Sequence, residues 1–574
     1  MNKNNLSSSS PDRNLVILIL FLAALAVKFL VFYLITDPII FVKYPHFAEQ
    51  IAQGKDIGER LLDLSPFYLL INQLSYYIYA KNWEALVIVQ IIIGSLNCVL
   101  VYLIGEKIFG KATGVLAAVL LILYGNLTLI DLTLEPEAVL IFLNSVIILL
   151  LIKADGNNAK IKSWLWLAAG LLAGLSVITK PNSLLVLVGI LIWIWFVRKE
   201  KLFRLRSTAL LLVGVVIAVA PITMRNYAKF HDFVLVTADG GKVFFHGNGP
   251  DANGIERADL PHQGFIEESS DEPDYAHALF RKTARSLSGQ ELKPSKCSSF
   301  WVGQTLTHIR SDLSAWIYLE LKKFCLFWNS YEVHDIDSNY KNYLALKKLP
   351  FLNFGILSVL GILGIAFSLK KFREAFLLYW MVLTYLATVL IFFASSRYRI
   401  PAAPFLAVLA AYLIIHVVSL WKEKKITAVL IIFSITVILG LGTHFSWQKD
   451  LARFDQWQRA TRLHYILGGK FLYNKGLYPE AVAELKKTIN LAPDFVPAYN
   501  LLGKAYAITN NYQSAESCFQ KVIELSPKID EGYINLGLLY RLTGNRSKAN
   551  LYLEKALSLN PHNEKARKHL QNQH

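Results

Sequence analysis

Charged residues are scarce in this chain of 574 residues. They make up 18% of it, whereas hydrophobic residues make up 54%. The mean hydropathy is +0.38. A composition this apolar excludes a single ordinary soluble domain, so lipid must form part of the solvent.

Cysteine is scarce too, and the chain contains no CxxC spacing. The cysteines are Cys98, Cys297, Cys325 and Cys518. Their scatter indicates neither a zinc site nor a disulfide framework, although one bridge between Cys297 and Cys325 stays open.

Acidic residues are outnumbered by basic ones, which gives a net charge of +17. The basic residues form short runs between apolar stretches rather than one polar face, so we predict no nucleic-acid partner.

Long apolar runs dominate the first three quarters of the chain. The first, Leu15 to Ile35, is too long for a signal peptide and lacks a small-residue cleavage site, so it predicts a retained helix. In all we expect about eleven spanning helices, because backbone amides in hydrocarbon must be satisfied within their own segment. Their centres fall near residues 25, 94, 119, 145, 171, 190, 215, 360, 384, 411 and 435. The pair flanking Lys180 is short and could form one broken or tilted unit.

Lysine and arginine in the short loops predict the orientation, because such loops stay preferentially in the cytoplasm. The cation-rich loops lie near residues 107–111, 153–162, 198–206, 370–373 and 422–425, and the alternate loops hold only Lys180, Arg397 and Arg399. With a cytoplasmic amino terminus and an odd helix count, the loops 37–83 and 225–349 and everything after about residue 445 lie outside. An even count would move the C-terminal domain to the cytoplasm. We predict a multi-pass protein of a bacterial inner (plasma) membrane.

The C-terminal part repeats itself. Pro493, Pro527 and Pro561 recur every 34 residues, the period of tetratricopeptide repeats. Further positions repeat with them: Tyr465, Gly469, Leu472, Ala481 and Leu485 in the first unit, Tyr499, Gly503, Tyr506, Ala515 and Phe519 in the second, and Tyr533, Gly537, Tyr540, Ala549 and Leu553 in the third. We therefore predict an all-α chain with a cytoplasmic N-terminus (1–13), a polytopic helical bundle (14–445), a linker (446–461) and three repeats that form an α-solenoid (462–574). Such arrays present a surface to a protein partner or pack against their own chain.

Carboxylates gather at one outward boundary of the bundle, where acidic groups cost free energy unless they face water, a partner or a substrate. They are Asp131, Glu135 and Glu137. A solvated loop is an equal explanation for Asp131 and Glu137, whereas Glu135 favours a site.

Cations stand at other outward boundaries, namely Lys180, Arg225, Arg397 and Arg399. Guanidinium groups suit phosphate oxygens and stay charged when partly desolvated. Snorkelling to the headgroups is the alternative, but anchoring cations favour the cytoplasmic face. We therefore predict that these four cations bind the phosphate of a phosphate-linked donor and that a carboxylate activates an acceptor hydroxyl. Tyr398, Asp131 and Asn248 are further cavity candidates.

The combination resembles the GT-C glycosyltransferases, in particular the dolichyl-phosphate-mannose protein mannosyltransferase-like group and its bacterial relatives with tetratricopeptide tails. The matching segments are Phe47 to Gly54, Ser65 to Tyr68, Leu134 to Pro136, Thr179 to Asn182, Pro221 to Tyr227, Asp239 to Gly254, Lys323 to Glu332 and Ser396 to Pro404. The resemblance implies an enzyme that transfers a sugar from a polyprenyl-phosphate carrier with inversion on the non-cytoplasmic face.

One position departs from that family. The resemblance implies a catalytic aspartate in the first outer loop, but Ile40 or its neighbours occupy its place, and Asp37 is the nearest carboxylate. Either Asp37 moves into register as the base, or Glu135 does more of the work, or the transferase is inactive.

Cofactor signals are few. The glycine-rich stretch from Gly240 to Gly254 lacks the strand and helix context of a nucleotide loop, so tight turns are the better explanation. A divalent cation (Mg or Mn) through Asp37 and Glu135 is open, although the spacing does not demand it.

We predict a membrane glycosyltransferase that uses a polyprenyl-phosphate sugar and an extracytoplasmic protein, lipid or glycan acceptor, with membrane lipid around it. The alternative is a catalytically degenerate scaffold whose repeats recruit an envelope or secretion partner. A flippase or transporter is a third reading, but paired inverted repeats are not visible.

Overall fold

The computed structural model describes residues 12–35, 43–155, 163–197, 200–250, 252–255, 275–333, 337–445, 457, 459–561 and 563–571. It divides into two compact units. The membrane unit comprises 1–259, 272–335 and 342–446, and the repeat unit comprises 260–271, 336–341 and 447–574. Regular structure in the described ranges is entirely helical, which confirms the all-α prediction.

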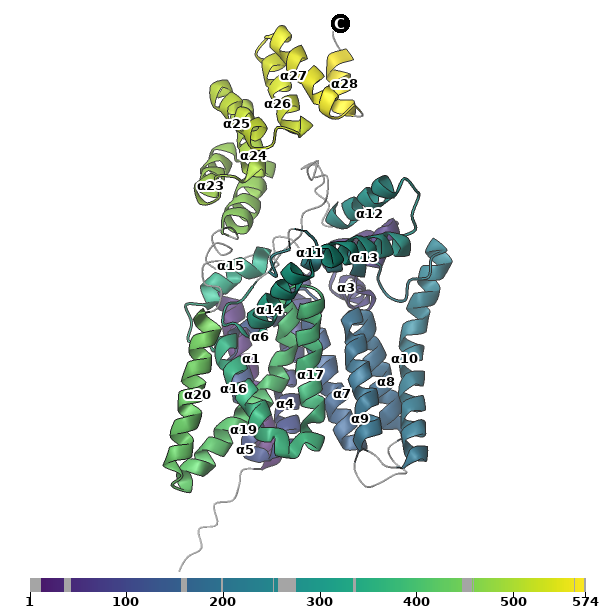
Figure 1. Ribbon diagram of the computed structural model, residues 1–574, viewed down its shortest axis with the longest axis vertical. Coiled ribbons are helices and arrows are strands. Elements are labelled where there is room, and N and C mark those ends of the chain that lie inside the picture. Colours follow the sequence, from purple (N-terminus) through teal and green to yellow (C-terminus); the bar gives the residue numbers. More distant parts are fainter. Residues whose placement is uncertain are drawn as a thin grey trace, which may run out of the picture. The chain divides into compact units, whose positions relative to one another are not determined.

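Long apolar helices build the membrane unit (Figure 1). They are α1 (Arg13–Leu34), α4 (Trp83–Phe109), α5 (Lys111–Ile122), α7 (Glu137–Ala154), α8 (Ser163–Thr179), α9 (Leu184–Val197), α10 (Lys201–Phe230), α16 (Phe354–Ser368), α17 (Phe372–Ile391), α19 (Ala403–Lys422) and α20 (Ile426–Phe445). Each predicted span centre falls within one of these helices.

Not all of them are long enough to cross a bilayer by themselves. Among the described residues, 7 helical stretches have the length and hydropathy of a span, and one of these is α16 and α17 joined through η3 (Leu369–Lys371). The helices near 111–122, 163–179 and 181–196 are shorter. The number of membrane crossings therefore stays a prediction.

Shorter helices connect the long ones. They are α2 (Lys43–Ala52), η1 (Gly58–Asp63), α3 (Pro66–Tyr79), α6 (Gly125–Asp131), η2 (Pro181–Ser183), α11 (Gly240–Asn248), α12 (Tyr275–Ser288), α13 (Pro294–Ser311), α14 (Leu313–Trp328), α15 (Asp337–Leu346), α18 (Ser396–Arg399) and η4 (Ile400–Ala402). In Figure 1, α11, α13 and α14 lie across one end of the bundle. The candidate site is at this end.

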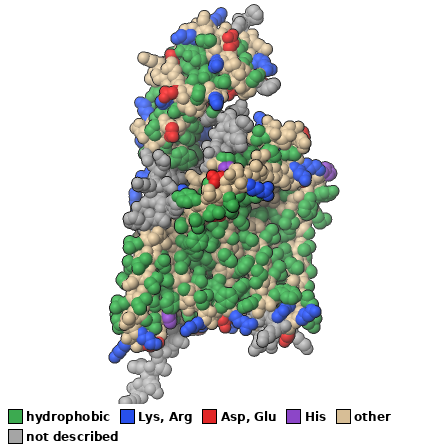
Figure 2. Space-filling view, viewed as in Figure 1, with side chains coloured by type: hydrophobic (Ala, Val, Ile, Leu, Met, Phe, Trp, Pro, Cys, Tyr) green, Lys and Arg blue, Asp and Glu red, His purple; other side chains and the backbone are tan. Residues whose placement is uncertain are grey.

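The opposite end gathers cation-rich loops, and Figure 2 shows a broad hydrophobic belt between the two ends of the membrane unit. Contacts join these loops. Arg13 pairs with Glu106 at 2.8 Å, Lys371 lies 5.5 Å from the ring centroid of Phe109, and Arg373 lies 5.8 Å from that of Phe196. The structure therefore places the ends of α4 and α9 beside η3 and the start of α17, as the charge pattern predicts. Which end faces the cytoplasm stays a prediction.

Glycines let two long helices approach closely. A Cβ on Gly170 of α8 would lie 2.1 Å from the carbonyl oxygen of Leu211, and one on Gly214 of α10 would lie 2.5 Å from that of Leu167. Small residues favour helix association in membranes because they allow backbone contact. The α8–α10 pair is therefore tightly packed.

The repeat unit is a series of helix pairs. It contains η5 (Arg459–Lys470), α22 (Phe471–Asn474), α23 (Tyr478–Leu491), α24 (Val496–Ile508), α25 (Tyr512–Leu525), α26 (Asp530–Leu542), α27 (Arg546–Leu559) and α28 (Glu564–Gln571). Within each pair the first helix packs on the second: η5 on α23, α24 on α25, and α26 on α27.

The same contact recurs in each pair. A Cβ on Gly469, Gly503 or Gly537 would lie 2.5 to 2.8 Å from the side chain at the facing position, namely Leu485, Phe519 and Leu553. The prolines recur structurally as well, because Tyr499 donates to the carbonyl of Pro493 and Tyr533 to that of Pro527, each at 3.1 Å. The 34-residue period therefore predicted the fold, and the structure repeats the same packing contacts at that period.

Substitution Gly503→Ala is expected to destabilise the repeat unit. The new methyl group would lie 2.5 Å from Phe519 Cε1, and overpacking of this kind costs about 1–3 kcal/mol. Limited proteolysis of the full-length protein should show earlier cleavage within residues 459–571. Ser517→Ala, at an exposed position of α25, is the control and should leave the pattern unchanged. Equal resistance of Gly503→Ala would contradict the packing argument.

The four cysteines are free in the structure, and Cys98, Cys297 and Cys518 are buried. The bridge left open between Cys297 and Cys325 is therefore not formed.

Candidate active site

Two carboxylates lie where α6 is followed by α7: Glu135 on the connecting turn and Glu137 at the start of α7. Gln90 of α4 holds this turn in place, because its Nε2 donates hydrogen bonds to the carbonyl oxygens of Asp131 at 3.2 Å and Thr133 at 2.7 Å. Pro136 then starts α7, so Glu137 is its first residue. This geometry presents Glu135 and Glu137 side by side at the end of the bundle.

Two cations meet these carboxylates. Lys180, from the break between α8 and η2, forms an ion pair with Glu137. Arg397, from α18, lies 3.4 Å from Glu135 through Nη1 and 3.4 Å from Glu137 Oε1 through Nε. The Lys180 ammonium also lies 5.1 Å from the ring centroid of Tyr398. The structure thus brings together residues that are up to 262 positions apart in the chain.

Burial differs between the two carboxylates. The side chain of Glu137 is fully buried, whereas that of Glu135 is 12% exposed. Glu137 Oε2 accepts no hydrogen bond from the described residues, and its Oε1 contacts both cations. Glu137 therefore contacts both cations, and Glu135 is the more accessible of the two carboxylates.

The environment of Glu135 raises the pKa of its carboxyl group to about 7. Burial is the largest cause and the neighbouring Glu137 adds to it, while Arg397, Lys180 and Lys43 act in the opposite direction. A carboxylate with a pKa near neutrality is suited to accept a proton as a general base.

Sequence reasoning missed two tyrosines of this site. The rings of Tyr44 and Tyr68 pack edge to face at 4.9 Å. Tyr44 Oη accepts a hydrogen bond from the amide of Ser65 at 3.2 Å, and Tyr68 Oη donates to Gln90 Oε1 at 2.5 Å. Burial raises the pKa of both phenols well above the usual value, and the charge of Glu135 adds to the effect. Tyr68 is the last residue of the segment Ser65 to Tyr68, which resembles the GT-C family, and this resemblance could have indicated that Tyr68 belongs to the site.

Known protein families match parts of both units. The profile described as dolichyl-phosphate-mannose-protein mannosyltransferase matches residues 63–224. The membrane unit contains a domain of this mannosyltransferase family. The match includes Glu135 and Lys180 and ends before Arg397. Two tetratricopeptide-repeat profiles match residues 496–529 and 530–563, which hold the pairs α24–α25 and α26–α27. No curated protein matches the sequence significantly.

Solved structures resemble the chain at low identity. The Archaeoglobus fulgidus oligosaccharyltransferase in its apo form is 14% identical with a TM-score of 0.43, and the alignment covers 78% of this chain and 58% of that one. The archaeal oligosaccharyltransferase AglB from Archaeoglobus fulgidus, in complex with an inhibitory peptide and a dolichol-phosphate, is 13% identical with a TM-score of 0.44. That alignment covers 78% of this chain and 58% of that one. ArnT from Cupriavidus metallidurans bound to undecaprenyl phosphate is 14% identical with a TM-score of 0.33. That alignment covers 70% of this chain and 78% of that one. The chain thus spans less than two thirds of the length of the oligosaccharyltransferase.

Asp131 of the mannosyltransferase-family domain lies in a separate ion pair. Its Oδ2 is 2.5 Å from Lys28 Nζ of α1, and the two side chains are 2% and 1% exposed. Asp131 therefore holds α6 to α1, and the cavity role predicted for it is not carried further.

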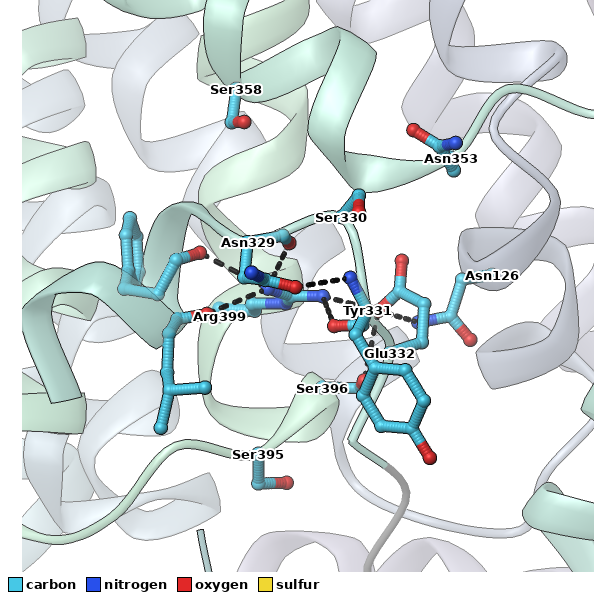
Figure 3. A network of polar contacts seen from close by, with 12 residues as sticks. Asn126, Asn329, Ser330, Tyr331, Glu332, Asn353, Ser358, Ser395, Ser396 and Arg399 are labelled. Atoms are coloured by element: carbon cyan, nitrogen blue, oxygen red, sulfur yellow. Dashed lines mark hydrogen bonds and ion pairs between the residues drawn. The ribbon is translucent and has the colours of Figure 1, made fainter. Parts of the chain in front are cut away.

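Arg399 also has different surroundings from Arg397 (Figure 3). Its guanidinium is 3% exposed, pairs with Glu332 at 2.9 Å, and donates to the carbonyl oxygens at the end of α14 and in the loop that follows, those of Leu326, Phe327, Asn329 and Tyr331. Because the guanidinium of Arg399 already binds these groups of the protein, we do not include Arg399 among the residues proposed to bind the donor phosphate.

Asn248 and Arg225 make internal contacts in this unit as well. Asn248 is 2% exposed and accepts hydrogen bonds from Trp316 at 3.1 Å and Lys323 at 2.8 Å, so it joins α11 to α14. Arg225 donates to Asn226 Oδ1 at 2.7 Å near the end of α10. The described contacts of neither residue include Glu135.

Asp37 and Ile40 lie outside the described residues. Within the described part, no three His, Cys, Asp or Glu side chains gather as metal ligands. Glu135 and Glu137 are already paired with cationic side chains. The divalent cation left open through Asp37 and Glu135 stays a prediction, and no catalytic step is derived through one.

Proposed function

We propose that the membrane unit transfers a sugar from a polyprenyl-phosphate donor to an acceptor hydroxyl outside the cytoplasm, with inversion. The carrying observation is that Glu135, a partly accessible carboxylate, lies beside Arg397 and Lys180, which Glu137 holds in place. The description of the matching family, which names a dolichyl-phosphate-linked mannose, supports the class of donor. The acceptor is a protein, lipid or glycan.

The residues take the following roles. The acceptor hydroxyl gives its proton to Glu135, and the hydroxyl oxygen forms a bond to C1 of the sugar. The bond between C1 and the phosphate oxygen breaks, and the polyprenyl phosphate leaves with the electron pair. Lys180 and Arg397 stabilise the charge that develops on the phosphate. A single displacement of this kind inverts the anomeric carbon.

The donor also tunes the base. The 3.4 Å contact between Arg397 and Glu135 is longer than a charge-assisted hydrogen bond of about 2.7–2.9 Å, so a phosphate oxygen can replace it. The positive charge of Arg397 lowers the pKa of Glu135. When Arg397 binds the donor phosphate instead, the pKa of Glu135 rises and the carboxylate becomes a stronger base.

A pH profile checks this assignment. A general base works when deprotonated, so kcat/KM should rise with pH and reach half of its maximum at about 7, the pKa of Glu135 in the free protein. The midpoint of kcat should lie higher, because the bound phosphate occupies Arg397. A flat profile between pH 5 and 9 would exclude Glu135 as the base.

The direct test uses purified full-length protein with radiolabelled polyprenyl-phosphate sugars and extracytoplasmic acceptors. Transfer of label should occur with at least one donor. No transfer with any donor, beside an active mannosyltransferase-family enzyme as control, would favour the scaffold alternative.

The predicted topology belongs to the same proposal. We place the cation-rich loops in the cytoplasm and the repeat unit outside, where it holds a protein acceptor or partner. Single cysteines introduced at Lys424 and Ser517 of a cysteine-free variant should react from opposite sides of an inner-membrane vesicle with a membrane-impermeant maleimide. Reaction of both from one side would show that α20 does not cross the membrane and would overturn the external placement of the repeat unit.

A further inference from the structure

We infer that Glu332 is a positioning residue of the proposed transfer site, because its carboxylate clamps α18 and thereby directs Arg397 toward Glu135 and Glu137. This inference rests on the proposed function for its kinetic readout, and its structural readout is independent of activity.

The clamp is a single buried carboxylate with partners on two sides (Figure 3). Glu332 follows α14 and is 2% exposed. On the α6 side it accepts hydrogen bonds from Tyr124 Oη at 2.9 Å and Asn126 Nδ2 at 3.0 Å. On the α18 side it accepts from Ser396 Oγ at 2.8 Å and Arg399 Nη2 at 2.9 Å. One side chain thus links the start of α6 to the helix that carries Arg397.

Helix α18 has 4 residues and continues through η4 into α19, so it is the first turn of a longer helical stretch. The backbone amides of a first turn have no intrahelical partner, so this turn depends on contacts from outside the helix. Ser396 and Arg399 are its first and last residues, and both bind Glu332. A backbone hydrogen bond from Ser396 N to the carbonyl of Val333 at 2.7 Å adds a contact with the same loop.

The geometry of a helix explains the effect on Arg397. Residues two apart on an α-helix point about 200° away from each other, because there are about 3.6 residues per turn. With Arg399 held against Glu332, Arg397 must project from the opposite face, where it meets Glu135 and Glu137. Loosening the clamp frees α18 to rotate and moves Arg397 away from the carboxylates.

A pair of substitutions separates positioning from stability. Ser396→Ala and Tyr124→Phe each delete one hydroxyl that donates to Glu332, but only Ser396 lies on α18. Neither removes a charge, and neither changes the groups that face Glu135, which are Arg397, Glu137, Lys180, Lys43, Tyr44 and Tyr68. The two variants should lose comparable thermal stability.

The kinetic readout is the pH midpoint of kcat/KM. Because Arg397 lowers the pKa of Glu135, Ser396→Ala should move the midpoint upward by about 0.5 to 1 pH unit and reduce kcat/KM about 10-fold at pH 7. Tyr124→Phe should leave the midpoint at the wild-type value. Equal midpoints in the two variants would overturn the inference while the proposed function stands.

The structural readout is amide hydrogen exchange across residues 395–402. Exchange should be faster in Ser396→Ala than in Tyr124→Phe, relative to the wild-type protein. This comparison decides the inference even if the wild-type protein transfers no sugar, in which case the proposed function fails separately. Unchanged exchange in Ser396→Ala would overturn the clamp.

Discussion

Substitution Glu135→Gln is expected to lower the rate of sugar transfer by about 10²- to 10⁴-fold, the usual contribution of a general base. Glutamine keeps the size of the side chain and its contact with Arg397 through the amide oxygen, but it accepts no proton. The loss should fall mainly on kcat, because the phosphate contacts of Lys180 and Arg397 remain. Initial rates with the radiolabelled donor at pH 8 measure it.

The control for this experiment is Glu84→Gln, which removes an exposed carboxylate from the start of α4 and should transfer at the wild-type rate. The variant Asp37→Asn tests the other candidate base. If Asp37→Asn is inactive while Glu135→Gln keeps wild-type activity, the assignment of the base to Glu135 is wrong.

The second large effect concerns stability. Substitution Lys28→Met should destabilise the membrane unit by about 3–5 kcal/mol, because it leaves Asp131 buried without its cation. The pair is nearly inaccessible, at 1% and 2% exposure. The space around it is closed as well: a Cβ on Gly94 would lie 2.2 Å from Asp131 Oδ2. The uncompensated carboxylate therefore has nowhere to reach water.

A double variant distinguishes an unpaired charge from lost packing. Lys28→Met with Asp131→Leu removes both charges, so it should be more stable than Lys28→Met alone, since apolar replacement of a buried pair is often neutral. Thermal unfolding in detergent gives the stability of the wild-type protein, Lys28→Met and the double variant. Lys107→Met, at an exposed position, is the matched control and should unfold at the wild-type temperature. An additive loss in the double variant would contradict the ion-pair argument.

Local patterns in the sequence were sufficient for most of the fold. The long apolar runs predicted the bundle helices, because in lipid each segment must satisfy its own backbone hydrogen bonds. The 34-residue period predicted the repeats, because each repeat packs only on its neighbours. Charge sorting placed Lys180 and Arg397 at the same end of the bundle as Glu135, and the structure brings the three together.

The sequence was insufficient to predict which charged side chains pair with each other inside the bundle. Asp131 and Glu135 are four residues apart, yet one pairs with Lys28 and the other lies beside Arg397. Arg397 and Arg399 are two residues apart, yet Arg399 is taken up by Glu332. The hydrophobic pattern records which segments enter lipid but not how each helix is rotated about its axis.

The sequence by itself therefore determined the helices, the repeats and the end of the bundle at which polar groups gather. Only the tertiary structure decided which of those polar groups face one another, because that depends on contacts between residues up to 262 positions apart in the chain. Side chains that are neighbours in the chain then separate into those that hold the bundle together, such as Asp131 and Arg399, and those that meet at the proposed transfer site, such as Glu135 and Arg397.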